Sequence, residues 1–86
     1  MPLHLDEDPD FGARLQEERE RIGLEVHELG HLAGKPVNIQ KRYEKGTSTI
    51  PIRYLQAIAL RTDISVQYIL TGKRGGAAFD SLPLKE

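Results

Sequence analysis

Apolar residues recur along this chain at spacings of three and four, and no stretch shows the strict alternation that is typical of a strand. The first stripe runs through Phe11, Leu15 and Ile22. Gly23 follows it and favours the left-handed turn that ends many helices. Asp10 precedes it and is a candidate N-cap residue. The pattern therefore predicts an amphipathic helix between the aspartate and the glycine.

Glycines, prolines and small polar residues divide the rest of the chain into four more predicted helices. The second covers residues 26–33, and the third covers residues 36–44. Pro51 opens the fourth, and Ser65 caps a short fifth helix. Only a short link around Gly34 joins the second and third helices, which is the spacing of a helix-turn-helix. The fold class predicted from this pattern is all-α.

The chain of 86 residues is long enough for one domain and too short for two. Residues 1–10 form an acidic N-terminal extension, residues 11–72 carry the helical pattern, and residues 73–86 form a C-terminal tail. Three apolar residues of the tail could dock on the domain or on a partner, and the alternative is disorder. These residues are Phe79, Leu82 and Leu84.

Charge is distributed unevenly, although the net charge is only −1. The first ten residues hold four acidic side chains and no Lys or Arg, whereas residues 35–61 hold six basic side chains and one acidic. A local basic patch of this kind suits a phosphate backbone. The absence of Cys excludes disulfides and thiol catalysis, and we expect a cytoplasmic protein of a bacterial cell with no membrane span.

Several short motifs follow one another along residues 11–72. They are Arg19-x-x-x-Gly23-Leu24, Leu29…Gly34, Tyr43-Glu44-x-Gly46, Pro51…Leu55-x-x-Ile58-Ala59 and Ser65-x-x-x-Ile69-Leu70-x-Gly72. In this order and spacing they resemble the Cro/repressor-type, phage-lambda-repressor-like helix-turn-helix family, and in particular short prophage and bacterial transcriptional regulators. The resemblance implies a five-helix lambda-repressor-like DNA-binding domain that acts on transcription, most simply as a repressor.

The resemblance also implies which residues meet double-stranded DNA, because the third helix of such a domain reads the major groove. Asn38 can pair with adenine, Lys41 or Arg42 can pair with guanine, and Val37 can pack on a thymine methyl group. Hydroxyl and ammonium groups after this helix suit phosphates. The expected DNA-binding residues are Val37, Asn38, Lys41, Arg42, Lys45, Thr47, Ser48 and Thr49.

Some positions are expected to support the third helix from behind. The resemblance implies an ion pair between Arg19 and Glu44, in which a planar guanidinium meets a carboxylate in two places. It also implies that Gly30 stands where a small residue lets the second helix approach the third. Gln40 is either a buried polar group or a DNA contact. Val26 stands where the family usually has a Gln that supports DNA binding.

A homodimer that binds a palindromic operator is the expected assembly, because one such domain makes few base contacts. The expected dimer surface uses the fifth helix and the apolar tail. The helix residues concerned are Val66, Tyr68 and Ile69.

One motif points to a different chemistry. His27-Glu28-Leu29-Gly30-His31 reads H-E-x-x-H, the pattern in which two His bind zinc and a Glu acts as general base. The third ligand of the longer pattern would fall at Val37. The adjacent Glu17 and Glu18 are most simply surface residues. We therefore expect no enzymatic activity, no metal or cofactor and no small-molecule ligand, and a zinc hydrolase is the least favoured interpretation.

A second interpretation is a protein-interaction module with the same fold and weak or no DNA binding. Val26 and the acidic residues 1–10 favour it slightly.

Overall fold

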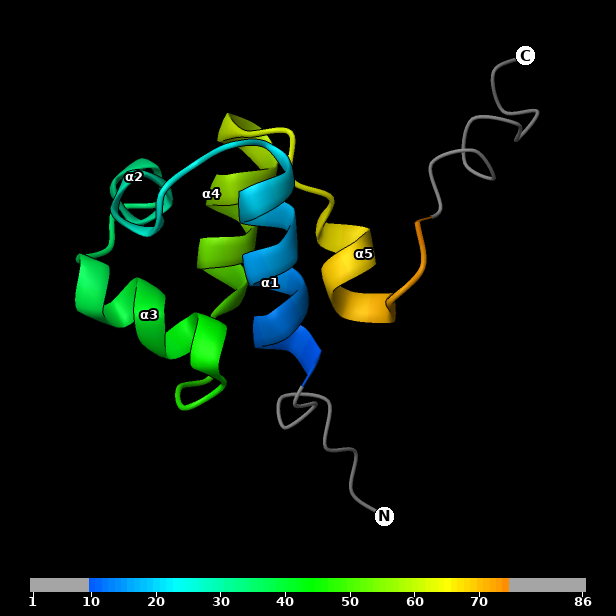
Figure 1. Ribbon diagram of the computed structural model, residues 1–86, viewed down its shortest axis with the longest axis horizontal. Coiled ribbons are helices and arrows are strands. Elements are labelled where there is room, and N and C mark those ends of the chain that lie inside the picture. The colour runs from blue at the N-terminus through cyan, green and yellow to red at the C-terminus, as the bar shows by residue number, and fades with distance from the viewer. Residues whose placement is uncertain (1–9, 75–86) are drawn as a thin grey trace.

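The computed structural model describes residues 10–74, and every regular element in that range is a helix (Figure 1). The helices are α1 (Asp10–Arg21), α2 (Val26–Leu32), α3 (Val37–Lys45), α4 (Ile52–Arg61) and α5 (Val66–Thr71). The all-α class predicted from the sequence is confirmed. Within the described range, none of these helices combines the length and the apolar character that a membrane crossing requires.

The helix boundaries agree with the predicted ones to within one or two residues. Pro36 and Pro51 are N-cap residues with extended backbones, so α3 and α4 each begin one residue later than predicted. Asp10 is the first residue of α1 rather than its cap. Ser65 caps α5 as expected, and its hydroxyl accepts a hydrogen bond of 3.0 Å from the Tyr68 backbone N–H.

Helix α1 lies between α3 on one side and α5 on the other, and it packs against both (Figure 1). Helix α2 packs against α3 and α4, and α4 also contacts α5. A four-residue turn separates α2 from α3. Gly34 lies in this turn with a φ of 75°, a conformation that glycine adopts without steric penalty. This arrangement leaves one side of α3 without a neighbouring helix.

The core is one cluster of apolar side chains that every helix supplies. Tyr43 of α3 and Tyr54 of α4 meet edge to face in it, with their ring centroids 4.7 Å apart. This geometry is favourable because the positive edge of one ring faces the negative face of the other. The buried members are Leu15, Leu29, Tyr43, Tyr54, Leu55, Ile58, Ile64 and Ile69.

Two glycines let helices approach closely. A Cβ at Gly30 of α2 would lie 2.8 Å from the Lys35 carbonyl oxygen and 3.3 Å from Gln40 Cβ, as the expected close contact with α3 requires. A Cβ at Gly12 of α1 would lie 2.5 Å from the carbonyl oxygen of Glu44. No local pattern marks Gly12, because its role depends on the contact between α1 and α3.

Glu18 is buried, which corrects the expectation that it is a surface residue beside Glu17. Its side chain is 0% exposed. The carboxylate accepts hydrogen bonds from Arg21 Nε at 2.8 Å, from the Ser65 backbone N–H at 2.7 Å and from Arg74 Nη1 at 2.7 Å. Glu18 falls on the apolar stripe of α1, three residues after Leu15, and this position places it inside the molecule.

The surroundings of Glu18 shift its pKa strongly. Burial alone raises the pKa, but the hydrogen bonds from Arg21, Ser65 and Arg74 outweigh burial and lower it from 4.5 to about 2. The carboxylate is therefore charged in the folded protein at neutral pH. It joins α1 to Ser65, the N-cap residue of α5, and to Arg74.

Candidate nucleic-acid interface

The outer side of α3 gathers five of the residues that the sequence analysis assigned to DNA. Val37, Asn38, Lys41, Arg42 and Lys45 are all exposed. They fall at steps of one, three or four residues, so they share one face of the helix. The structure thus brings these side chains together on one surface, which we call the outer face of α3.

The loop after α3 continues this surface. Gly46 ends the helix with a φ of 78°, and the Thr47 backbone N–H then donates to the Arg42 carbonyl oxygen at 3.0 Å. Thr47 and Thr49 are exposed, and Ser48 is half-buried. The hydroxyl groups expected to meet phosphates therefore lie next to the cations of α3.

The basic side chains of the outer face have no partner among the residues that the structure describes. Among residues 10–74, the side chains of Lys41, Arg42 and Lys45 take part in no hydrogen bond or ion pair. Arg53 of α4 is also exposed and unpartnered within this range. By contrast, every other arginine of the described chain donates to a protein oxygen. These are Arg14, Arg19, Arg21, Arg61 and Arg74.

The inner side of α3 is held by the ion pair expected between Arg19 and Glu44. Arg19 Nε donates to Glu44 Oε2 at 2.8 Å, and Arg19 Nη2 donates to Glu44 Oε1 at 3.1 Å. Arg19 Nη1 also donates to the Leu24 carbonyl oxygen at 2.8 Å. The hydrogen bonds to Glu44 raise the pKa of Arg19. This two-pronged contact fixes α3 against α1 because both planar groups must align.

Gln40 extends the network and resolves the alternative left open by the sequence. Its side chain is 0% exposed, so it is a buried polar group rather than a DNA contact. Its Nε2 donates to Glu44 Oε2 at 2.7 Å, and its Oε1 accepts from the Tyr54 hydroxyl at 2.6 Å. Burial raises the pKa of Tyr54, so the hydroxyl remains a donor. The chain of polar contacts therefore runs from α1 through α3 to α4.

A shallow hollow lies at the edge of the outer face. Val26, at the first position of α2, lines it together with Lys41 and Lys45, and Arg19 and Glu44 form part of its wall. Val26 has no hydrogen-bonding side chain, so it cannot orient a neighbouring polar group as a Gln could. This position therefore contributes an apolar side chain to a hollow that two lysines also line.

The His27-Glu28-x-x-His31 motif serves the structure of α2. The carboxylate of Glu28 accepts a hydrogen bond of 2.7 Å from the Glu25 backbone N–H, and the two residues form a capping box. Both His side chains are exposed. Within residues 10–74, no group of three or more candidate metal ligands occurs. The helix cap accounts for the Glu that the motif would use as a general base.

The expected dimer surface on α5 is only partly available. Ile69 is 0% exposed and belongs to the core, so its assignment to a dimer contact is wrong. Val66 is half-buried against the core. The Tyr68 hydroxyl donates to Glu17 at 2.6 Å, and the Arg74 guanidinium lies 3.9 Å from the centre of the Tyr68 ring. The tail residues Phe79, Leu82 and Leu84 lie outside the described residues.

Comparison with protein-family models, with curated proteins and with solved structures finds no match to this chain.

Proposed function

We propose that this protein is a sequence-specific double-stranded DNA-binding regulator of transcription with a lambda-repressor-like helix-turn-helix, in which α3 enters the major groove. The observation that carries the proposal is the contrast among the arginines: Arg42 and Arg53 have no partner in residues 10–74, whereas the other five do. Phosphates and base edges are the partners that such a surface suits.

The outer face of α3 offers both base and phosphate contacts. Asn38 is the second residue of α3 and Arg42 lies about one turn later, and both are exposed. Side chains near the start of a recognition helix reach base edges. Lys45 and the hydroxyls of Thr47 and Thr49 suit the flanking phosphates. The largely buried Arg19–Glu44 pair holds the helix in one orientation, which base readout requires because hydrogen bonds to bases tolerate little misplacement.

Binding to a random duplex at a series of salt concentrations tests whether the protein binds DNA through its phosphates. We expect log affinity to fall linearly with log salt, with a slope of about −0.9 for each phosphate neutralised. Selection of bound sites from a random pool then tests sequence preference, and a two-fold symmetric site made of two half-sites is the expected product. A helical protein that does not bind DNA even at low salt would contradict the proposal.

Charge removal on the outer face tests the residues themselves. Lys41→Ala and Arg42→Ala should each weaken binding by about tenfold. Lys73→Ala is the matched control, because it removes one exposed charge two residues after the end of α5, and α5 lies on the opposite side of α1 from α3 (Figure 1). Equal losses in all three variants would indicate a general charge effect and would contradict the assignment to α3.

The hollow around Val26 favours a second candidate, which is a protein-interaction module that binds an acidic peptide. The hollow is lined by one apolar side chain, Val26, and by Lys41 and Lys45, whose ammonium groups have no partner in residues 10–74, so it suits a partner with one apolar anchor and nearby carboxylates. Val26→Gln separates the two functions. It should leave or improve DNA affinity under the first proposal and should weaken peptide binding under the second.

A further inference from the structure

The first turn of α1 lies against the last turn of α3. A Cβ at Gly12 would lie 2.5 Å from the carbonyl oxygen of Glu44, so the two backbones are in contact there. Figure 1 shows the start of α1 and the end of α3 at the same end of the molecule. Residues 1–9, which we call the N-terminal segment, join the described structure at Asp10, two residues before this contact. The segment is therefore attached next to the unpartnered cations of α3.

The hollow around Val26 lies within reach of this segment. Gln16 of α1 lines the hollow that Val26 and the two lysines of α3 also line. Gln16 follows Asp10 by six residues, which corresponds to about 9 Å along an α-helix. Leu5 precedes Asp10 by five residues, and an extended chain of that length spans up to about 17 Å. Leu5 and the acidic residues after it can therefore reach the hollow.

The N-terminal segment has the chemistry that this hollow suits. Leu5 is an apolar side chain, and Asp6, Glu7 and Asp8 follow it directly. The segment contains no Lys or Arg that would neutralise these carboxylates from within. The hollow offers the complementary set, which is the apolar Val26 beside the unpartnered cations of α3. Complementary charges of this kind fix the register of a contact and exclude wrong partners.

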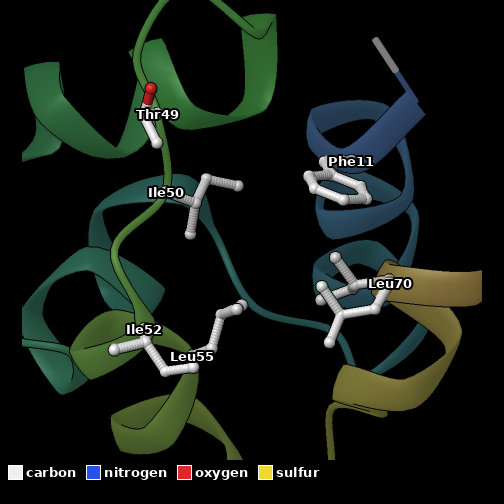
Figure 2. A pocket seen from close by; sticks show the side chains of 7 residues that line it. Phe11, Thr49, Ile50, Ile52, Leu55 and Leu70 are labelled. Carbon is white, nitrogen blue, oxygen red and sulfur yellow. The ribbon is translucent and has the colours of Figure 1, made fainter. Parts of the chain in front are cut away.

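An apolar groove between α1, α4 and α5 also lies near the start of α1, but it suits this segment less well. Figure 2 shows Phe11 of α1 on one side of the groove, and Ile50 and Leu55 on the other. None of the described residues that line it is charged, and Thr49 is the only polar one. The groove can bury a leucine, but it offers the adjacent carboxylates no cation. The charge of the segment therefore favours the hollow around Val26.

We propose that the N-terminal segment binds the hollow around Val26 and the adjoining part of the outer face of α3, and that it competes there with DNA. The inference rests on the proposed function, because the segment and the duplex use the same cations. A short tether holds its occupant at an effective concentration on the order of 1 mM, so a weak contact is enough to fill the site. Affinity for every duplex is then multiplied by the fraction of molecules whose outer face is uncovered.

Spin labelling of the full chain without DNA tests the contact itself. The chain has no cysteine, so Pro2→Cys provides a single attachment site for a nitroxide. We expect the label to broaden the backbone amide NMR signals of Lys41 and Lys45 more than that of Leu70, which lines the apolar groove. Leu5→Ser in the labelled chain should reduce the broadening at α3, although it changes no charge. Stronger broadening at Leu70, or broadening at α3 that Leu5→Ser leaves unchanged, would overturn the proposal.

Affinity for a random duplex tests the competition. The double substitution Asp6→Asn, Glu7→Gln should strengthen binding by about threefold to tenfold, because the outer face is uncovered more of the time. The matched control is Asp80→Asn, Glu86→Gln, which removes the same two types of charge from the C-terminal tail and should change affinity by less than about twofold. The tail follows Arg74, and Arg74 binds α1 beside α5, on the opposite side of α1 from α3 (Figure 1). Equal gains in the two double variants would indicate a general charge effect and would refute the competition.

Leu5→Ser in the unlabelled chain separates the apolar anchor from the charges. It should strengthen binding to the random duplex by about twofold, because it weakens the contact in the hollow and leaves the net charge unchanged. Leu84→Ser in the C-terminal tail is its matched control and should bind like wild type. A general charge effect cannot produce a gain in Leu5→Ser alone, and an affinity equal to that of wild type would count against the proposal.

The two measurements distinguish a failure of this inference from a failure of the proposed function. All these substitutions lie outside residues 10–74, so helices α1 to α5 should remain intact, and far-UV circular dichroism checks their content. If every variant binds the random duplex as wild type does and the label does not broaden α3, the competition alone is refuted. If the label broadens α3 but no variant binds DNA at low salt, the proposed function alone is refuted.

Discussion

The basic side chains of α1 and those of the outer face of α3 have opposite surroundings. Arg14, Arg19 and Arg21 each donate to a carbonyl or carboxylate of the protein. Arg42 and Lys41 donate to none in residues 10–74. The arginines of α1 therefore serve the fold, and the cations of α3 are available to something outside it.

Glu44 and Glu18 show how the first group acts. Glu44 binds Arg19 of α1 and Gln40 of its own helix, and Gln40 accepts from Tyr54 of α4, so this network connects three helices through side chains alone. Glu18 instead accepts one backbone N–H from Ser65 as well as two guanidinium groups. In a core this small, charged networks orient helices that apolar packing alone holds less firmly. Removing members of each group tests this distinction.

The largest effect is expected for Glu44→Ala. It leaves the nearly buried Arg19 guanidinium without its partner, and it removes the acceptor of Gln40, so the free energy of unfolding should fall by about 3–5 kcal/mol. Urea denaturation followed by circular dichroism measures it. Glu20→Ala is the control, because Glu20 lies 3.7 Å from Arg19 but is 59% exposed, and its loss should change stability by less than about 1 kcal/mol. Similar losses in the free energy of unfolding for the two variants would contradict a structural role for the Arg19–Glu44 pair.

A smaller loss is expected for Glu18→Gln, about 2 kcal/mol at neutral pH, because three donors lose a charged acceptor. The pH dependence provides a second test. The pKa of Glu18 is lowered from 4.5 to about 2 in the folded state. The unfolded chain therefore binds the proton more readily, and the stabilisation is present above pH 4.5 and is lost as pH falls towards 2.

Urea titrations at a series of pH values between these limits measure the effect. Wild type should lose more stability than Glu18→Gln over this range. Parallel profiles of stability against pH for the two proteins would show that Glu18 does not cause the loss of stability at low pH.

The next effect is that of Tyr54→Phe, which leaves the buried Gln40 oxygen without its donor and should reduce stability by about 1 kcal/mol. Tyr68→Phe removes a hydroxyl whose hydrogen bond to Glu17 is exposed, so it should have a smaller effect. Thermal unfolding of both variants in parallel compares them. An equal loss from both would indicate that burial of the hydroxyl does not matter here.

The smallest effect on stability is expected for the cations on the outer face of α3. Lys41→Ala and Arg42→Ala should change the free energy of unfolding by less than about 0.5 kcal/mol, because neither side chain has a partner in the described chain. The same variants are the ones expected to lose DNA affinity. Loss of folding in either variant would show that the substituted cation supports the fold, as the arginines of α1 do.

Much of the local structure could be predicted because its signals are local. Glycines with positive φ lie at the ends of helices, and Ser65 is the cap that its side chain suggests. Burial was harder to predict for polar residues. The adjacent carboxylates of Glu17 and Glu18 favour two surface positions, but Glu18 shares the stripe of Leu15 and Ile22 and is buried. Residue type was the weaker signal because a paired carboxylate can be buried.

The candidate site also contains residues whose positions follow from local spacing and one residue, Gln40, whose environment does not. The five positions on the outer face of α3 follow from helical spacing once the helix is recognised. Gln40, on the same helix, could not be assigned from the sequence, because its environment depends on where Tyr54 and Glu44 lie. The Glu44 carboxylate lies one turn further along α3, but the Tyr54 hydroxyl comes from α4, and only packing brings it to the amide of Gln40.

Capping and periodicity act over a few residues, so the five helices, their ends to within one or two residues and the side chains that share the outer face of α3 follow from the amino-acid sequence. Tertiary structure alone decided which charges are paired, that Glu18 and Gln40 are buried, that Gly12 must be small, and that Leu70 rather than Ile69 projects from α5. These properties depend on contacts between segments that are distant in the chain. The same local pattern is compatible with several such contacts until the helices pack.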